Sequence, residues 1–125
     1  MGPVCVDANG VALGGYDAVS YFKGDGTPVK GTADLSAEHE GAKYHFASDE
    51  HRAAFVQDPG KYLPQYGGYC AAGMAGGYKA PTDPLAATII DGKLYLNYSA
   101  KVVDMWKPNA KSNIAKADEN WRKIK

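Results

Sequence analysis

Cysteine is scarce in this chain: only Cys5 and Cys70 occur among its 125 residues, and no Cys-x-x-Cys pair is present. A structural zinc site made of four thiolates is therefore excluded. A framework of several disulfides is excluded as well, because two thiols allow one bridge at most. The sequence leaves that bridge open, since a disulfide needs Cα atoms within about 7 Å and an oxidising compartment.

The chain also lacks a net charge and long apolar runs. Its 14 basic and 14 acidic residues cancel, whereas nucleic-acid-binding proteins cluster Lys and Arg on one face. No segment approaches the ~18 consecutive apolar residues of a membrane span. We therefore expect neither a nucleic-acid partner nor a membrane span, and the length predicts a single domain over residues 1–125.

Motifs of common enzyme classes are missing too. The glycine-rich segment 67–77 lacks the Gly-Lys-Ser/Thr ending of a phosphate-binding loop. The carboxylates form no recognisable acid–base pair. An enzymatic function is therefore disfavoured, although the sequence leaves it undecided.

The residues that are present predict an α+β fold of short elements. Asp91-Gly92 lies between two apolar runs, which is among the strongest hairpin signals, and Ser48 is a good N-cap for a helix. Two hairpins are expected, over 37–47 and 88–98, the first after a polar loop over 23–35. Helical segments are expected over five ranges: 16–22 with Asp17 near the N-cap, 48–57, 70–75, 100–106 and 108–124.

Cys70 is the first candidate for chemistry. It begins the short helix over 70–75, where backbone N–H groups and the helix dipole favour a thiolate. A thiolate is both a metal ligand and a nucleophile, yet a free cysteine often only packs. Met74 follows one helical turn later on the same face, as a second sulfur ligand or as a core residue. Sulfur and imidazole together favour copper over magnesium or calcium.

Three histidines offer imidazole, which suits zinc, copper and iron. His51 lies in the first turn of the helix over 48–57, either as a ligand or as part of the helix cap. His45 lies on the strand face opposite two aromatic residues, so it faces solvent or a pocket beside the hairpin. His39 lies between two glutamates and is expected in solvent.

The segment 44–63, with the sequence YHFASDEHRAAFVQDPGKYL, resembles the YHS-domain family. In cysteine-bearing members a strand ends in Phe-Cys-Ser-x-x-Cys, and a helix with a Phe and the sequence Pro-x-x-Tyr-Leu follow. The residues that match are Phe46, Ser48, Phe55, Pro59, Tyr62 and Leu63. Ala47 and His51 occupy the two cysteine positions.

The resemblance extends along most of the chain. Pro3-Val4-Cys5 is similar to the opening of the metal-binding members. Segments 14–17, 66–70 and 91–98 look like those of small stand-alone bacterial members, which are usually exported. The resemblance thus implies a YHS-like core over 36–75 and a C-terminal hairpin with helices over 85–125.

Metal binding is the function that this resemblance implies. We expect a non-catalytic binding or carrier module for copper, with zinc or iron less favoured, in the periplasm or secreted. A metal-handling protein is a possible partner, and the chain is expected as a monomer or weak dimer. Binding should weaken as the pH falls through ~6, because protons compete for the ligands. The candidate ligands are Cys70, His51, His45, Cys5 and Met74.

Two other functions stay open. One is a thiol redox or small-molecule-binding protein that uses Cys70, whose thiolate should then alkylate quickly near neutral pH. The other is a structural interaction module without chemistry.

Overall fold

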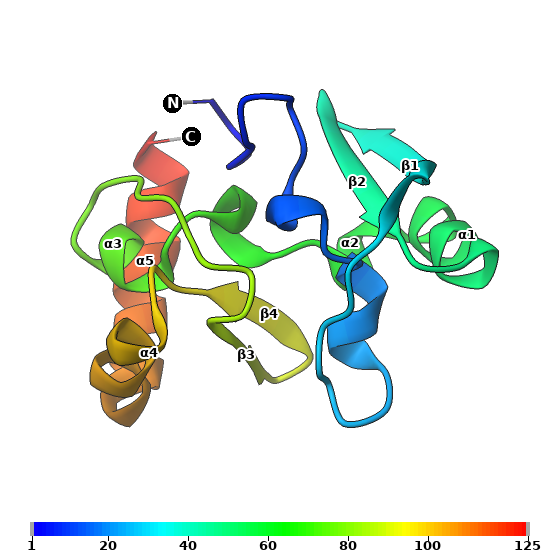
Figure 1. Cartoon of the computed structure of the whole chain (residues 1–125). Helices are drawn as coiled ribbons and strands as arrows, with labels where there is room; N and C mark the ends of the chain where they lie inside the picture. Colours follow the sequence, from blue (N-terminus) through cyan, green and yellow to red (C-terminus); the bar gives the residue numbers. More distant parts are fainter. Residues whose placement is uncertain (1, 125) are drawn as a thin grey trace. The chain divides into compact units, whose positions relative to one another are not determined.

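The computed structural model describes residues 2–124, so the two ends of the predicted domain, residues 1 and 125, lie outside the described part. The fold is α+β, as predicted, with two antiparallel two-stranded sheets and several short helices (Figure 1). The strands are β1 (Thr32–His39), β2 (Ala42–Phe46), β3 (Ala87–Ile90) and β4 (Lys93–Leu96). The α-helices are α1 (Asp49–Gln57), α2 (Pro59–Tyr62), α3 (Ala71–Ala75), α4 (Ala100–Trp106) and α5 (Ala110–Ile124). Short 3₁₀ segments are η1 (Leu13–Gly15), η2 (Ala18–Phe22), η3 (Gln65–Gly68) and η4 (Lys107–Asn109).

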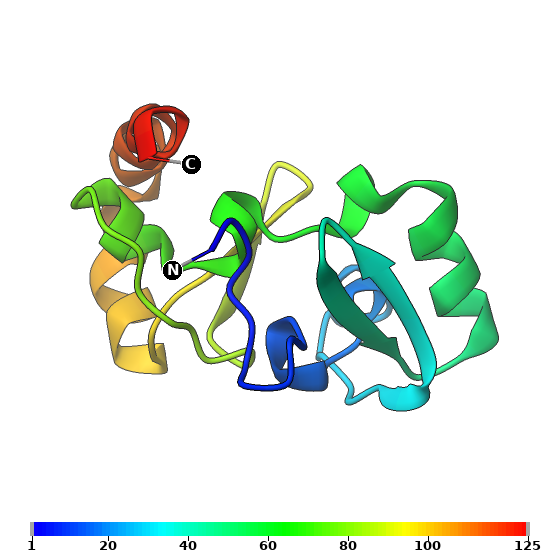
Figure 2. The same cartoon turned by 90° about the horizontal axis from the view of Figure 1, so that it is seen from above.

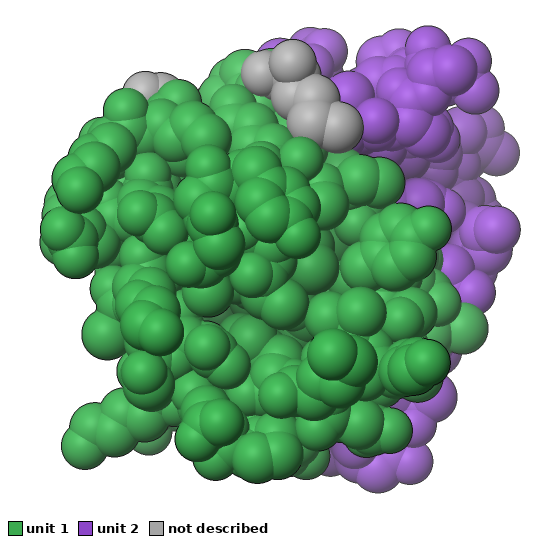
Figure 3. All heavy atoms as spheres, turned by 90° about the vertical axis from the view of Figure 1, so that its left-hand side faces the viewer, with its two compact units in different colours: residues 1–5, 64–125 green, residues 6–63 purple. Residues whose placement is uncertain are grey.

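Contacts divide the chain into two compact units (Figure 3). Residues 6–63 form the first, here called the N-terminal unit. Residues 1–5 and 64–125 form the second, the C-terminal unit. Each unit contains one of the two hairpins. The expectation of a single domain over residues 1–125 stays a prediction.

The core of the N-terminal unit is the contact between α1 and the β1–β2 hairpin. Tyr44 and Phe46 alternate with polar residues along β2 and are buried, as a period of two requires. Phe55 of α1 packs on both rings, with centroids 4.9 and 5.1 Å apart. Figures 1 and 2 both show α1 alongside this hairpin.

Strand β1 begins earlier than the sequence predicts. Part of the expected loop over 23–35 is strand, because β1 starts at Thr32, which pairs with Phe46. The register shifts between Thr32 and Ser36, which indicates a bulge. The side chains at the start of β1 are exposed. This part is a strand because its backbone pairs with β2, and its sequence shows no alternation of apolar and polar residues that would predict a strand.

The hairpin turn predicted at Asp91-Gly92 is confirmed in the C-terminal unit. β3 and β4 pair from Ala87 with Leu96 to Ile90 with Lys93. Asp91 and Gly92 have φ values of 53° and 74°, the left-handed conformation that a two-residue hairpin turn needs.

Aromatic and small residues form the core of the C-terminal unit, and α3 lies against α5 there (Figure 1). Its buried members are Tyr66, Ala71, Met74, Tyr95, Trp106 and Ala117. Helix α5 begins at Ala110 rather than at the predicted Pro108, because residues 107–109 first make a tighter 3₁₀ turn that continues from α4. Within residues 2–124 no helix has the length and apolar character needed to cross a bilayer.

Candidate functional site

His51 is placed by the N-terminus of α1. Ser48 caps this helix, and its Oγ accepts a hydrogen bond from His51 N at 3.1 Å. The predicted cap and helix are confirmed. Because the backbone of His51 is bound to the cap, its side chain projects from a fixed position in the first turn.

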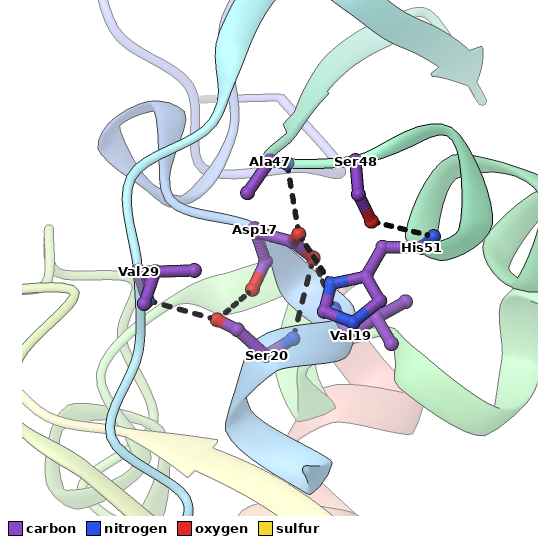
Figure 4. Close-up of polar contacts among 7 residues, drawn as sticks. All are labelled: Asp17, Val19, Ser20, Val29, Ala47, Ser48 and His51. Carbon is purple, nitrogen blue, oxygen red and sulfur yellow. Dashed lines mark hydrogen bonds and ion pairs between the residues drawn. The ribbon is translucent and has the colours of Figure 1, made fainter.

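Asp17 holds the His51 ring (Figure 4). Its Oδ1 accepts hydrogen bonds from Val19 N at 2.9 Å and Ser20 N at 3.2 Å, which caps η2 as predicted. Its Oδ2 accepts from Ala47 N at 2.9 Å and lies 2.7 Å from His51 Nδ1. One carboxylate therefore joins η2, the end of β2 and the start of α1.

The carboxylate is itself fixed by its neighbours. Asp17 is fully buried, and its backbone N donates to Val29 O at 2.8 Å. Ser20 Oγ donates to Asp17 O at 2.6 Å and accepts from Val29 N at 3.0 Å. Since both carboxylate oxygens are held by hydrogen bonds, the carboxylate can turn very little.

This arrangement determines what His51 can do. A carboxylate accepts hydrogen bonds, so Nδ1 is the donor in this contact, and in the neutral ring the lone pair then lies on Nε2. The side chain of His51 is 27% exposed, whereas that of Asp17 is 0% exposed. An oriented imidazole of this kind can bind a metal ion or exchange a proton through Nε2.

The sequence placed Asp17 only at a helix cap and missed its contact with His51. The cap uses Oδ1 and leaves the second oxygen available for residues that are distant in sequence. The segment 14–17 belonged to the family resemblance, and this was the one signal that pointed to a role beyond the cap.

The other two histidines have different surroundings in the N-terminal unit. His45 is half-buried on β2, and its Nδ1 lies 3.4 Å from the position that a Cβ on Gly15 would occupy. His39 contacts the ring of Phe55, at 6.1 Å between centroids, and its Nε2 lies 4.0 Å from Glu40 Oε1. The ring of His39 is thus partly buried rather than fully solvated.

Cys70 and Met74 lie in the interior of the C-terminal unit. Cys70 is the N-cap of α3, where its Sγ accepts a hydrogen bond from Gly73 N at 3.4 Å. Met74 is 0% exposed and belongs to the aromatic core. Both cysteines are free thiols.

The thiol of Cys5 is half-buried. The backbone N of Cys5 donates a hydrogen bond to Gly67 O at 2.8 Å, which connects the start of the chain to η3. Burial raises the pKa of the Cys5 thiol above its ordinary value, and hydrogen bonds from Thr82 only partly oppose this effect. Little of the thiol is therefore ionised at neutral pH.

We expect Cys5 to alkylate slowly at pH 7 and faster as the pH rises beyond the ordinary cysteine range. The measurement is the rate of iodoacetamide modification against pH in Cys70→Ser, since serine also caps helices well. A rate profile that levels off at or below the ordinary cysteine value of about 8.5 would contradict the raised pKa.

The predicted ligands are divided between the two units. His45 and His51 belong to the N-terminal unit, whereas Cys5, Cys70 and Met74 belong to the C-terminal unit. Among the described residues, no group of three or more His, Cys, Asp or Glu side chains is placed to hold a metal ion. The five-residue ligand set therefore stays a prediction.

Fold and site together define a small α+β module that presents one oriented histidine. The YHS domain family model matches residues 24–66, roughly a third of the chain. Residues 24–66 are therefore similar to the YHS domain, which is generally linked to metal binding. Comparison with curated proteins and with solved structures finds no match. Asp17 lies outside the matched segment, whereas His51 lies within it.

Proposed function

We propose that this chain is a non-catalytic module that binds or carries a metal ion, with His51 as the anchoring ligand. The observation that carries the proposal is the 2.7 Å contact between His51 Nδ1 and the buried Asp17 Oδ2. A histidine that binds a metal nearly always gives its other ring N–H to a carboxylate, carbonyl or water, which fixes the ring and raises the basicity of the free nitrogen. The family's link to metal binding supports the same function.

Copper is the proposed ion, ahead of zinc and iron. An imidazole nitrogen suits all three and does not suit magnesium or calcium. The preference for copper depends on the soft sulfur atoms of Cys70, Cys5 and Met74, with His45 as a second imidazole. A place of action outside the cytoplasm rests on the resemblance to exported family members.

The test is a titration of the reduced protein with Cu(I), Cu(II) and Zn(II), beside His51→Gln and His39→Gln. The two histidines form a matched pair, because their side chains are 27% and 29% exposed. Only His51 has a buried carboxylate behind it, whereas His39 faces the exposed Glu40.

We expect one metal ion per chain in the wild type and in His39→Gln. Affinity in His51→Gln should fall about tenfold or more, since even loss of a group behind a ligand costs 10- to 100-fold. Equal affinity in all three proteins would show that His51 is not a ligand. Absence of saturable binding in the wild type would overturn the proposed function.

A further inference from the structure

A buried thiol and a buried carboxamide contact each other in the C-terminal unit, whereas His51 belongs to the N-terminal unit. Cys70 and Asn97 are 3% and 0% exposed. The Cys70 thiol donates to Asn97 Oδ1 at 3.4 Å, while its sulfur accepts from Gly73 N. The Asn97 carboxamide therefore contacts a thiol, which is a group that can be oxidised.

The orientation of the Asn97 carboxamide is fixed by the backbone. Ala72 N donates to Asn97 Oδ1 at 2.9 Å, so the atom at that position must be the oxygen, which can accept. The amide nitrogen Nδ2 is then a donor. It is buried, and among residues 2–124 it has no hydrogen-bond partner. A buried donor without an acceptor is unfavourable and calls for a physical explanation.

We propose that Cys70 is a redox-responsive thiol, which a hydroperoxide converts to a sulfenic acid held by the Asn97 carboxamide. A sulfenic acid, S–O–H, has an acceptor oxygen and a donor O–H on the same atom. The carboxamide offers a donor, Nδ2, beside an acceptor, Oδ1. The thiol uses the acceptor alone, so oxidation gives the unpaired Nδ2 a partner that the reduced form does not supply.

The reaction balances with the hydroperoxide as the oxidant. The Cys70 sulfur attacks one peroxide oxygen, an S–O bond forms and the O–O bond breaks. The second oxygen leaves with the electron pair and takes up the proton that the thiol has lost, which yields water from hydrogen peroxide or an alcohol from an organic hydroperoxide. Sulfur loses two electrons, and an external thiol can reverse the step.

A peroxide needs a route to the buried sulfur, and the segment between α3 and β3 lies against Cys70. This segment, residues 76–86, has no helix or strand, and Ala80 O accepts the hydrogen bond of Cys70 N at 3.0 Å. Tyr78 in the same segment is 58% exposed. Local opening of such a segment needs less free energy than global unfolding, so it provides a route for a small peroxide.

The experiment uses Cys5→Ser, which removes the second thiol and so prevents condensation to a Cys5–Cys70 disulfide. Folded protein is treated with hydrogen peroxide, the peroxide is removed, and a dimedone probe is added after increasing delays. Mass spectrometry then gives the fraction of Cys70 trapped as sulfenic acid. The same series is run with Asn97→Asp in the Cys5→Ser protein, which retains an acceptor for Ala72 N but has no amide donor.

We expect a trappable sulfenic acid on Cys70 whose lifetime is about tenfold longer than in the Asn97→Asp protein, the ratio that one lost hydrogen bond of this kind implies. Circular dichroism establishes that both proteins are folded. If Asn97→Asp does not fold, the lifetime of the Cys70 sulfenic acid in Cys5→Ser is compared with that of the Cys5 sulfenic acid in Cys70→Ser. The Cys5 sulfenic acid should then have the shorter lifetime. Equal lifetimes in either comparison would overturn the proposal, as would oxidation of Cys70 straight to sulfinic acid or no oxidation at all.

Discussion

Replacement of Asp17 by alanine is expected to lower the free energy of unfolding by about 3 kcal/mol or more. The carboxylate is fully buried, and it is the acceptor for Val19 N, Ser20 N and Ala47 N as well as for the His51 ring. Alanine would leave Val19 N and Ala47 N without an acceptor, each at a cost of about 1–3 kcal/mol, whereas Ser20 N keeps its bond to the backbone oxygen of residue 17 at 3.1 Å. The loss of the buried contact with the His51 ring adds to this cost. Urea denaturation followed by circular dichroism measures the change.

The matched control for this substitution is Asp25→Ala in the same unit. Asp25 is exposed, and its Oδ1 accepts one local hydrogen bond, from Thr27 N at 3.0 Å. Water can replace that bond, so stability should hardly change. A similar loss of stability in both variants would show that the buried network around Asp17 contributes nothing special.

The role of Asp17 in folding affects how the proposed metal binding can be tested. Because Asp17 joins η2, β2 and α1, a variant at this position changes stability and the orientation of His51 together. Loss of metal binding in such a variant would not separate the two effects. His51→Gln and His39→Gln avoid this difficulty, because both leave the carboxylate in place with its three backbone donors.

Local signals in the sequence were sufficient to predict many of the elements. The helix that begins after Ser48, the turn at Asp91-Gly92 and the cap by Asp17 are each set by residues within a few positions of one another. The start of β1 was missed, because its exposed residues pair through the backbone and carry no apolar pattern.

The site depends on contacts that local patterns cannot show. Asp17 and His51 are 34 residues apart, and Cys70 and Asn97 are 27 apart. His51 could be predicted as a candidate ligand because it occupies a cysteine position of the YHS motif. Cys70 could be predicted as a candidate because it begins a helix. Asp17 was expected only near a helix cap, and no local pattern links Asn97 with Cys70, so the sequence alone gave no reason to form either pair.

Replacement of Gly31 by alanine is the second substitution with a large expected effect. A Cβ at this position would lie 2.4 Å from His45 C and 2.5 Å from Phe46 N. Both neighbours are backbone atoms of β2, which the pairing with β1 holds in place. Overpacking costs typically 1–3 kcal/mol, and we expect about 3 kcal/mol here because no flexible side chain can move aside. The midpoint of urea unfolding should fall while its slope stays unchanged.

Gly60→Ala is the control for Gly31→Ala, because both add one methyl group to a glycine of the N-terminal unit. A Cβ on Gly60 would find its nearest neighbour, Asp58 Oδ1, at 3.9 Å, and Gly60 lies in helix α2. This variant should be as stable as the wild type or more stable by about 0.4–1 kcal/mol, since alanine restricts the unfolded chain. If Gly31→Ala were equally stable, β2 would have to shift away from residue 31. Ala47, whose N donates to Asp17 Oδ2, directly follows β2, so that shift would also disturb the carboxylate that orients His51.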